Sequence, residues 1–226
     1  MGLVNYRETE MTTRKSLPIL LVLVIFYSYS ASAQDSGMRF FLTSKGPGNG
    51  ANLGGLEGAD AHCRMLAETS GAKKEQWHAY LSTQATDQQT SINARDRIGE
   101  GPWLNAKGVE VASSVANLHS DNNNLTKHTV LNENGEIVSG RGDEPNRHDI
   151  LTGSQEDGTA FSSGEDRTCS NWTDNGEGSA QIGHHDRVGG GDAGSSWNSS
   201  HGTRGCSQEN LRGTGGDGLF YCFATD

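Results

Sequence analysis

Leu219-Phe220-Tyr221-Cys222-Phe223, close to the carboxyl end of the chain, is the stretch that decides the fold. An apolar run of five residues rich in aromatic side chains predicts a strand, here the last one of the chain. One of the four cysteines stands inside this run, so a disulfide can tie the strand to another element. The other three cysteines indicate which element that is.

Cys63 lies on a predicted amphipathic helix, because apolar residues recur there at helical spacing from Leu56 to Ala67 and Gly71 can end the helix. Cys169 and Cys206 bracket a long glycine-rich stretch. Four cysteines allow three connectivities. We favour an outer bridge Cys63–Cys222 around an inner bridge Cys169–Cys206, which would join the first helix to the last strand, while the other two pairings remain open.

The amino end has the pattern of an export signal. Arg14 and Lys15 precede an apolar run over residues 17–26, and Ala31-Ser32-Ala33 has the small residues of a cleavage site. We therefore expect a signal peptide over residues 1–33, cleavage after Ala33, and a mature domain over 34–226 that is secreted or periplasmic. The apolar run is shorter than the roughly 20 residues of a membrane span, so no integral span is expected after cleavage.

Composition narrows the classes of partner. The formal net charge is −10, which would repel nucleic acid. Glycine accounts for 31 of 226 residues and hydrophobic residues for only 32%, which indicates one domain with a small core and much loop. In such a domain the loss of a native disulfide costs roughly 2–5 kcal/mol.

The remaining elements are predicted from local patterns. Strands are expected at 39–43 and 77–81, a short helix at 93–98, a hairpin over 130–138 around Asn134-Gly135, and a weaker strand at 150–151. From 153 to 218 strand signals almost vanish. Loops of roughly sixty residues are usually functional or disordered, so this region is the expected binding surface.

Several segments together resemble a known family. They are 54–63 (GGLEGADAHC), 77–83 (WHAYLST), 94–98 (ARDRI), 168–173 (TCSNWT), 196–198 (SWN), 205–206 (GC) and 220–222 (FYC). In this order they resemble the endostatin-like branch of the C-type lectin-like superfamily, which includes bacterial secreted proteins, over about residues 38–224. The resemblance implies an α+β, C-type lectin-like fold with two helices flanking antiparallel sheets, a long loop region and two nested disulfides. It also implies a binding module.

The long loop offers short polar groups of the kind that bind hydroxyl-rich ligands. Two tryptophans stand among them, and each is expected to pack over its neighbouring disulfide more readily than to stack on a sugar. The candidate ligand-binding residues are Asn171, Trp172, Asp174, Asn175, Asp192, Trp197 and Asn198.

No cofactor is required by the sequence, but two patterns suggest a metal. Glu144-Pro145-Asn146 matches a sugar-binding Ca²⁺ motif of C-type lectins, with Glu144 and Asn146 as oxygen ligands, although Trp197-Asn198-Ser199 lacks the carboxylate of the second motif. The imidazole and carboxylate groups of His184, His185, Asp186 and His201 suit Zn²⁺. If 184–186 is extended, His184 and Asp186 share a face and His185 points away.

Sequence signatures of catalysis are missing: there is no Gly-x-Ser-x-Gly elbow and no His-Glu-x-x-His motif. Four paired cysteines would also leave no nucleophilic thiol. We therefore expect a non-catalytic secreted module that recognises carbohydrate or glycoprotein through its loop region. The alternatives are an adhesin that binds extracellular-matrix or surface protein without reading sugar, and a structural module of a cell-envelope assembly.

Overall fold

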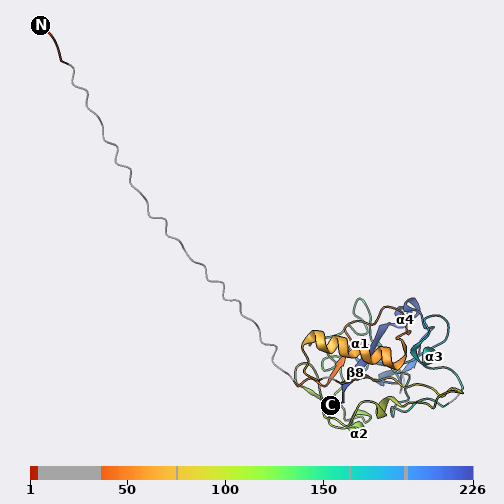
Figure 1. Cartoon of the computed structure of the whole chain (residues 1–226). Helices are drawn as coiled ribbons and strands as arrows, with labels where there is room; N and C mark the ends of the chain where they lie inside the picture. Colours follow the sequence, from red (N-terminus) through yellow and green to blue (C-terminus); the bar gives the residue numbers. More distant parts are fainter. Residues whose placement is uncertain (5–36, 75, 163, 191–192, 226) are drawn as a thin grey trace. The chain divides into compact units, whose positions relative to one another are not determined.

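The predicted last strand is the longest strand described and lies at the centre of the main sheet. The computed structural model describes residues 1–4, 37–74, 76–162, 164–190 and 193–225 (Figure 1). Over these residues the terminal run forms β8 (Gly216–Ala224), in a six-stranded sheet of order β1-β8-β5-β6-β7 with β2 also paired to β8. The predicted signal peptide falls almost wholly on residues 5–36, outside the described residues.

Three strands pair directly with β8. β1 (Phe40–Leu42) and β2 (Trp77–Ala79) run antiparallel to it, whereas β5 (Asp149–Leu151) runs parallel. Beyond β5 the sheet continues with β6 (Gln181–His184) and β7 (His201–Gly202), both antiparallel to their neighbours. The parallel β5–β8 pair corrects the expectation that the sheets are entirely antiparallel.

Successive side chains of β8 enter two different cores because side chains alternate across a strand. Phe220 and Cys222 belong to one buried cluster, and Leu219, Tyr221 and Phe223 belong to the other. A strand buried on both faces needs an apolar residue at every position. This is why the run is continuous and does not alternate with polar residues.

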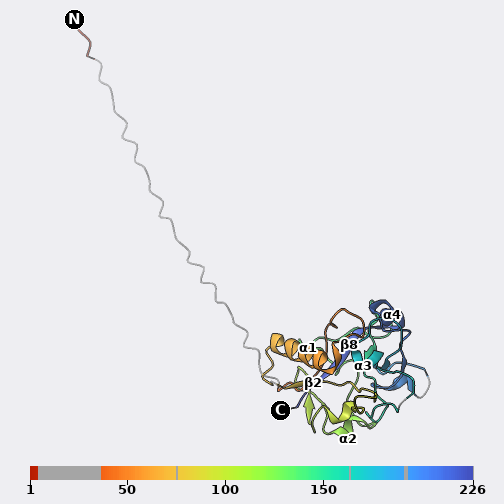
Figure 2. The same ribbon diagram turned by 45° about the vertical axis from the view of Figure 1, so that its right-hand side comes forward.

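Helices cover the sheet on both sides. α1 (Gly55–Ser70) contributes Ala59, Cys63 and Leu66 to the cluster that holds Phe220, and Figures 1 and 2 both show it alongside β8. The short α2 (Val115–Leu118) packs into the other cluster. α4 (Gln208–Thr214) leads directly into β8. The mixed α+β class is therefore confirmed.

Both predicted disulfides are present. Cys63 on α1 is bonded to Cys222 on β8, and Cys169 is bonded to Cys206. The first helix is therefore tied to the last strand, as the sequence predicts. Paired cysteines fit an oxidising compartment, and none of the helices in the described residues is long and apolar enough to cross a membrane.

The region from 153 to 218 holds more regular structure than its sequence predicts. It contains β6, β7, α4, the start of β8 and a short 3₁₀ turn, Ala193–Ser195. The strands there are short, and polar or glycine residues interrupt them, so their pattern gave no signal. Conversely, the predicted hairpin at 130–138 is reduced to a single bridge, Leu131 to Ile137, around its turn.

Two further elements complete the fold. The helix predicted at 93–98 is a single 3₁₀ turn, Ala94–Asp96. A separate two-stranded sheet, β3 (Trp103–Leu104) with β4 (Glu110–Ala112), was not predicted. Its buried residues Trp103, Val111 and Ala112 belong to the same cluster as Tyr221.

Candidate functional site

A left-handed turn is the most unusual backbone feature of the chain. Its four residues are Cys169 (φ 47°), Ser170 (φ 55°), Asn171 (φ 54°) and Trp172 (φ 69°), and together they form α3. None of them is glycine, and a left-handed helical conformation costs an L-residue roughly 1–2 kcal/mol. Such strain persists only where the surrounding structure enforces it, and it is concentrated at functional sites.

Covalent and polar contacts hold this turn in place. Cys169 is bonded to Cys206, and Oγ1 of Thr168 accepts a hydrogen bond from the backbone N–H of Asn171 at 3.0 Å. The Asp166 carboxylate accepts from the N–H groups of Thr168 (2.9 Å) and Ser170 (2.6 Å). The turn is therefore fixed at both ends and along its polar face.

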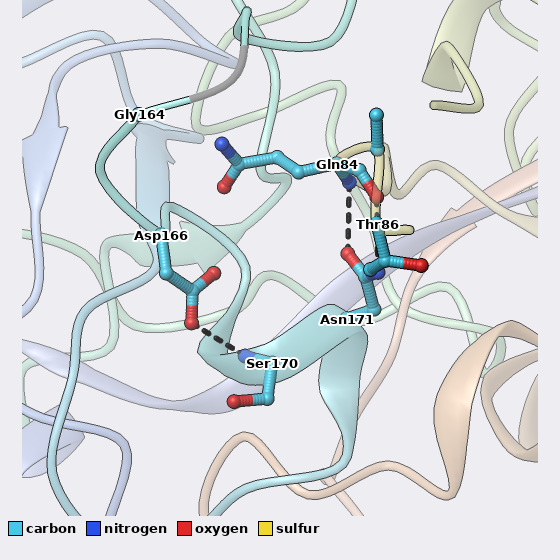
Figure 3. Close-up of a pocket in the computed structure, with 7 residues that line it drawn as sticks. Gln84, Thr86, Gly164, Asp166, Ser170 and Asn171 are labelled. Atoms are coloured by element: carbon cyan, nitrogen blue, oxygen red, sulfur yellow. Dashed lines mark hydrogen bonds between the residues drawn. The ribbon is translucent and has the colours of Figure 1, made fainter. Parts of the chain in front are cut away.

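A pocket opens beside the turn. Its volume is about 490 Å³, and its lining consists of the polar residues Gln84, Thr86, Asp166, Ser170 and Asn171 together with Ala85 and Gly164 (Figure 3). The amide of Asn171 pairs with the backbone of Gln84: its Oδ1 accepts from the Gln84 N–H at 2.8 Å and its Nδ2 donates to the Gln84 carbonyl at 3.1 Å. The pocket wall is therefore held rigid before any ligand arrives.

The predicted ligand-binding residues do not gather at one place. Asn171 lines the pocket. Asp174 and Asn175 lie on the following turn, where Asp174 accepts from the Gly176 N–H and Asn175 donates to Oδ1 of Asn49 at 2.6 Å. Asp192 lies outside the described residues. The sequence therefore located the loop that carries the pocket but not Gln84, Thr86 and Asp166, which complete it.

Both predicted binding tryptophans are buried, in agreement with the packing expectation. Trp172 lies in the cluster that contains Cys169 and Cys206, and its Nε1 donates to the Ser82 carbonyl at 2.8 Å. Trp197 does not pack over a disulfide, which corrects that part of the prediction. It lies in the other cluster, against Tyr80 and Tyr221. Neither ring is presented to solvent.

Asn198 is also an interior residue. Only 1% of it is exposed, and its Nδ2 donates to the Tyr80 hydroxyl at 2.9 Å and to the carbonyls of Gln155 and Glu156. Its amide therefore joins the loop at 155–156 to the core. These bonds occupy its amide nitrogen within the protein.

The predicted zinc residues divide into two groups. Nε2 of His184 and Nε2 of His201 lie 3.1 Å apart, so the structure brings these two together. His185 is buried on the other side of the strand, with Nε2 3.2 Å from the Ser139 carbonyl, and burial lowers its pKa. Asp186 accepts from the backbone N–H of Arg141 at 2.6 Å. This geometry corrects the prediction that His185 and Asp186 are direct metal ligands.

Two residues that the sequence analysis did not select, His148 and Asp149, stand beside His184. Nε2 of His148 is 3.0 Å from Oδ1 of Asp149, and its Nδ1 is 3.4 Å from Oδ1 of Asp186. Burial lowers the pKa of His148, but these two carboxylates outweigh it and raise the pKa to about 9. The sequence signal for this position was the weak strand at 150–151, whose pairing with 181–184 was not predicted.

The predicted Ca²⁺ ligands do not form a cation site. Glu144 is exposed, and Asn146 lies in a different cavity, where its Oδ1 accepts from the His148 N–H. Among the described residues, His148, Asp149 and His184 are one group of acidic and histidine side chains close enough together to hold an ion. Glu144 is not one of them.

Comparison of the sequence with protein-family models and with curated proteins finds no match.

Proposed function

We propose that this protein is an exported, non-catalytic binding module that recognises carbohydrate, free or on a glycoprotein, in the pocket beside the left-handed turn. The observation that carries the proposal is the turn itself: two of its four strained non-glycine residues, Ser170 and Asn171, line one pocket. Strain of this kind is maintained where a precise arrangement of groups is needed. A disulfide that fixes it fits an exported protein.

The chemistry of the pocket suits a ligand rich in hydroxyl groups. Its lining supplies a carboxylate from Asp166 and hydroxyls from Thr86 and Ser170, while the Asn171 amide fixes the wall by pairing with the Gln84 backbone. These groups offer acceptors and donors for sugar hydroxyls. The volume of about 490 Å³ falls within the range of small-ligand pockets.

A glycan array probed with the purified protein tests the proposal. We expect the protein to bind a defined set of glycans and Ser170→Trp to weaken that binding at least about tenfold, because the indole would occupy the pocket. Ser170 is exposed and its side chain is not one of the groups that hold the turn, so the variant should fold. Asn175→Ala, on the next turn and outside the pocket, is the matched control.

The same protein should lose binding to a glycoprotein once the glycans are removed enzymatically. Equal binding to the glycosylated and stripped forms would instead support an adhesin that recognises matrix or surface protein. Binding to neither, together with co-purification of envelope proteins, would support a structural module. Either result would remove the carbohydrate proposal.

A further inference from the structure

Three adjacent strands place acidic and imidazole side chains on one face of the sheet. Asp149 on β5 lies directly opposite His184 on β6, and residues directly opposite in an antiparallel pair share a face. On the other side of β6, His201 on β7 lies opposite Ile182, two residues before His184. This diagonal offset brings the His201 and His184 rings onto that same face, within reach of each other.

The polar atoms of these side chains converge. Nε2 of His184 is 3.3 Å from Oδ1 of Asp149, Nε2 of His201 is 3.8 Å from the same oxygen, and the two Nε2 atoms are 3.1 Å apart. Ligand atoms around a tetrahedral Zn²⁺ with bonds of 2.0–2.1 Å are separated by about 3.3 Å. The separations of 3.1 and 3.3 Å are close to this value, and the third, 3.8 Å, is somewhat longer.

The other ring nitrogens identify the tautomers. Nδ1 of His184 lies 2.7 Å from the Gly194 carbonyl, and Nδ1 of His201 lies 3.1 Å from the Gly202 carbonyl. A carbonyl only accepts, so each Nδ1 can donate a proton there, and in a ring that carries that one proton the Nε2 lone pair is the group available to a metal. Metal-bound histidines characteristically donate their second nitrogen to such an acceptor.

His148 stands beside this arrangement, with its Nε2 3.0 Å from Oδ1 of Asp149. Asp149 has only 2% of its side chain exposed, and no group in the described part of the chain makes a hydrogen bond of good geometry to either of its carboxylate oxygens. Without a proton or a metal ion between them, the two facing Nε2 atoms and the buried carboxylate would repel one another. A metal ion would satisfy all three groups at once.

We propose that Asp149, His184 and His201 bind one transition-metal ion, and that this ion is Zn²⁺. Two imidazole nitrogens and one carboxylate oxygen form a donor set typical of zinc, whereas Ca²⁺ takes oxygen ligands alone. His148 is a positioning residue, because its ring is stacked nearly parallel to that of His184, at 4.1 Å and 13°. Parallel rings cannot direct their in-plane lone pairs at one ion.

The ion would keep an accessible coordination position. Two of the three ligands, His184 and His201, line a cavity of about 600 Å³, together with Arg141, Asn146, Ser200 and Thr214 among others. His201 has 43% of its side chain exposed, so solvent reaches this side of the site. Three protein ligands and an open fourth position distinguish this site from a closed structural zinc site. None of the three proposed metal ligands lines the pocket beside the left-handed turn.

Metal analysis of the purified full-length protein tests the site. After saturation with ZnCl₂ and removal of loosely bound ions, we expect one Zn²⁺ per chain by elemental analysis, with a matching calorimetric titration. His201→Gln should weaken Zn²⁺ binding by about 100-fold or more. Because His201 is half-exposed, this variant keeps the core intact, and its circular dichroism should match that of the wild type. His128→Gln, at an exposed histidine, is the matched control.

A second readout needs no variant. Co²⁺ substituted into the wild-type protein should give the intense visible absorption of a four-coordinate nitrogen and oxygen site, and added Zn²⁺ should abolish it. The proposal is overturned if the wild type retains no metal, or if His201→Gln retains Zn²⁺ as tightly as the wild type. Loss of binding in His128→Gln would overturn it as well. Glycan binding is measured separately, so this site and the carbohydrate proposal can fail independently.

Discussion

A half-buried histidine, His119, follows helix α2 and contacts Tyr80 in the core cluster that contains Tyr221. Nδ1 of His119 donates to the Val115 carbonyl at 2.8 Å, so its Nε2 accepts from the Tyr80 hydroxyl at 2.7 Å. Burial raises the pKa of Tyr80 and keeps its hydroxyl protonated. Burial, with Arg95 nearby, lowers the pKa of His119 below the ordinary 6.5. The native network therefore needs a neutral imidazole.

This histidine makes stability depend on pH. Below pH 6.5 His119 becomes protonated in the unfolded chain but stays neutral in the native state, because its native pKa is lower. The unfolded state therefore binds more protons, and the free energy of unfolding falls as the pH drops. The fall continues until the pH reaches the lowered native pKa. Urea unfolding at pH 7.5 and pH 5.0, both with chelator present, should show a smaller loss for His119→Gln than for the wild type. An equal loss in His119→Gln and His128→Gln would contradict this account.

At the scale of secondary-structure elements, helix α1 ends because of one glycine. Gly71 has φ 81°, a left-handed conformation that ends the helix and lets its N–H reach carbonyls of the last turn. An added Cβ would meet no atom within 4 Å, so replacement by alanine would act through the backbone alone. Gly213, on the exposed side of α4, has no such backbone requirement.

The two glycines should therefore respond in opposite directions to the same change. We expect Gly71→Ala to destabilise the protein by about 1 kcal/mol, because alanine resists a positive φ. Gly213→Ala should stabilise it by roughly 0.5–1 kcal/mol, because alanine favours a helix interior. Chemical denaturation of both variants beside the wild type measures the difference, and a change of the same sign in both would refute the assignment of the helix end.

At the scale of the whole molecule, the two disulfides have different tasks. Cys63–Cys222 spans 159 residues and joins α1 to β8, whereas Cys169–Cys206 spans 37 and fixes the left-handed turn. In the chain-entropy description the longer loop contributes about 5 kcal/mol and the shorter about 4 kcal/mol. The free energy of unfolding should therefore depend somewhat more on the outer bridge, Cys63–Cys222. The shape of the pocket should depend on the inner bridge, Cys169–Cys206.

Replacing each pair by alanine separates these tasks. Removal of Cys63–Cys222 should lower the free energy of unfolding by about 1 kcal/mol more than removal of Cys169–Cys206. Removal of Cys169–Cys206 should abolish glycan binding, because the strained turn can relax. The measurements are denaturation curves and glycan binding at a temperature where both variants are folded. Retained binding without the inner bridge would show that the turn does not need its disulfide.

Patterns within one element were read correctly from the sequence. The terminal run, the helix that ends at Gly71 and the pairing of the four cysteines are all present as predicted. These features depend on local periodicity and on the chemistry of single residue types. The resemblance to C-type lectin-like proteins is consistent with the mixed α+β class and stays a proposal at the level of the specific fold.

The sites depended on strand pairing that no local pattern reveals. Asp149 faces His184 only because β5 lies between β6 and β8, and β6 itself is four residues long with a glycine inside it. Gln84 reaches Asn171 across 87 residues of sequence. Such contacts arise from the register of distant segments, in which a slip of one residue would turn each side chain to the other face.

The sequence alone therefore determined the terminal core strand and the first helix and favoured one pairing of the cysteines, since hydrophobic spacing is a local property. Only the tertiary structure decided that Cys169–Trp172 forms a left-handed turn and that Asp149, His184 and His201 meet at one point. The physical reason is that a strained backbone and a convergent set of ligands are both imposed by neighbours distant in the chain.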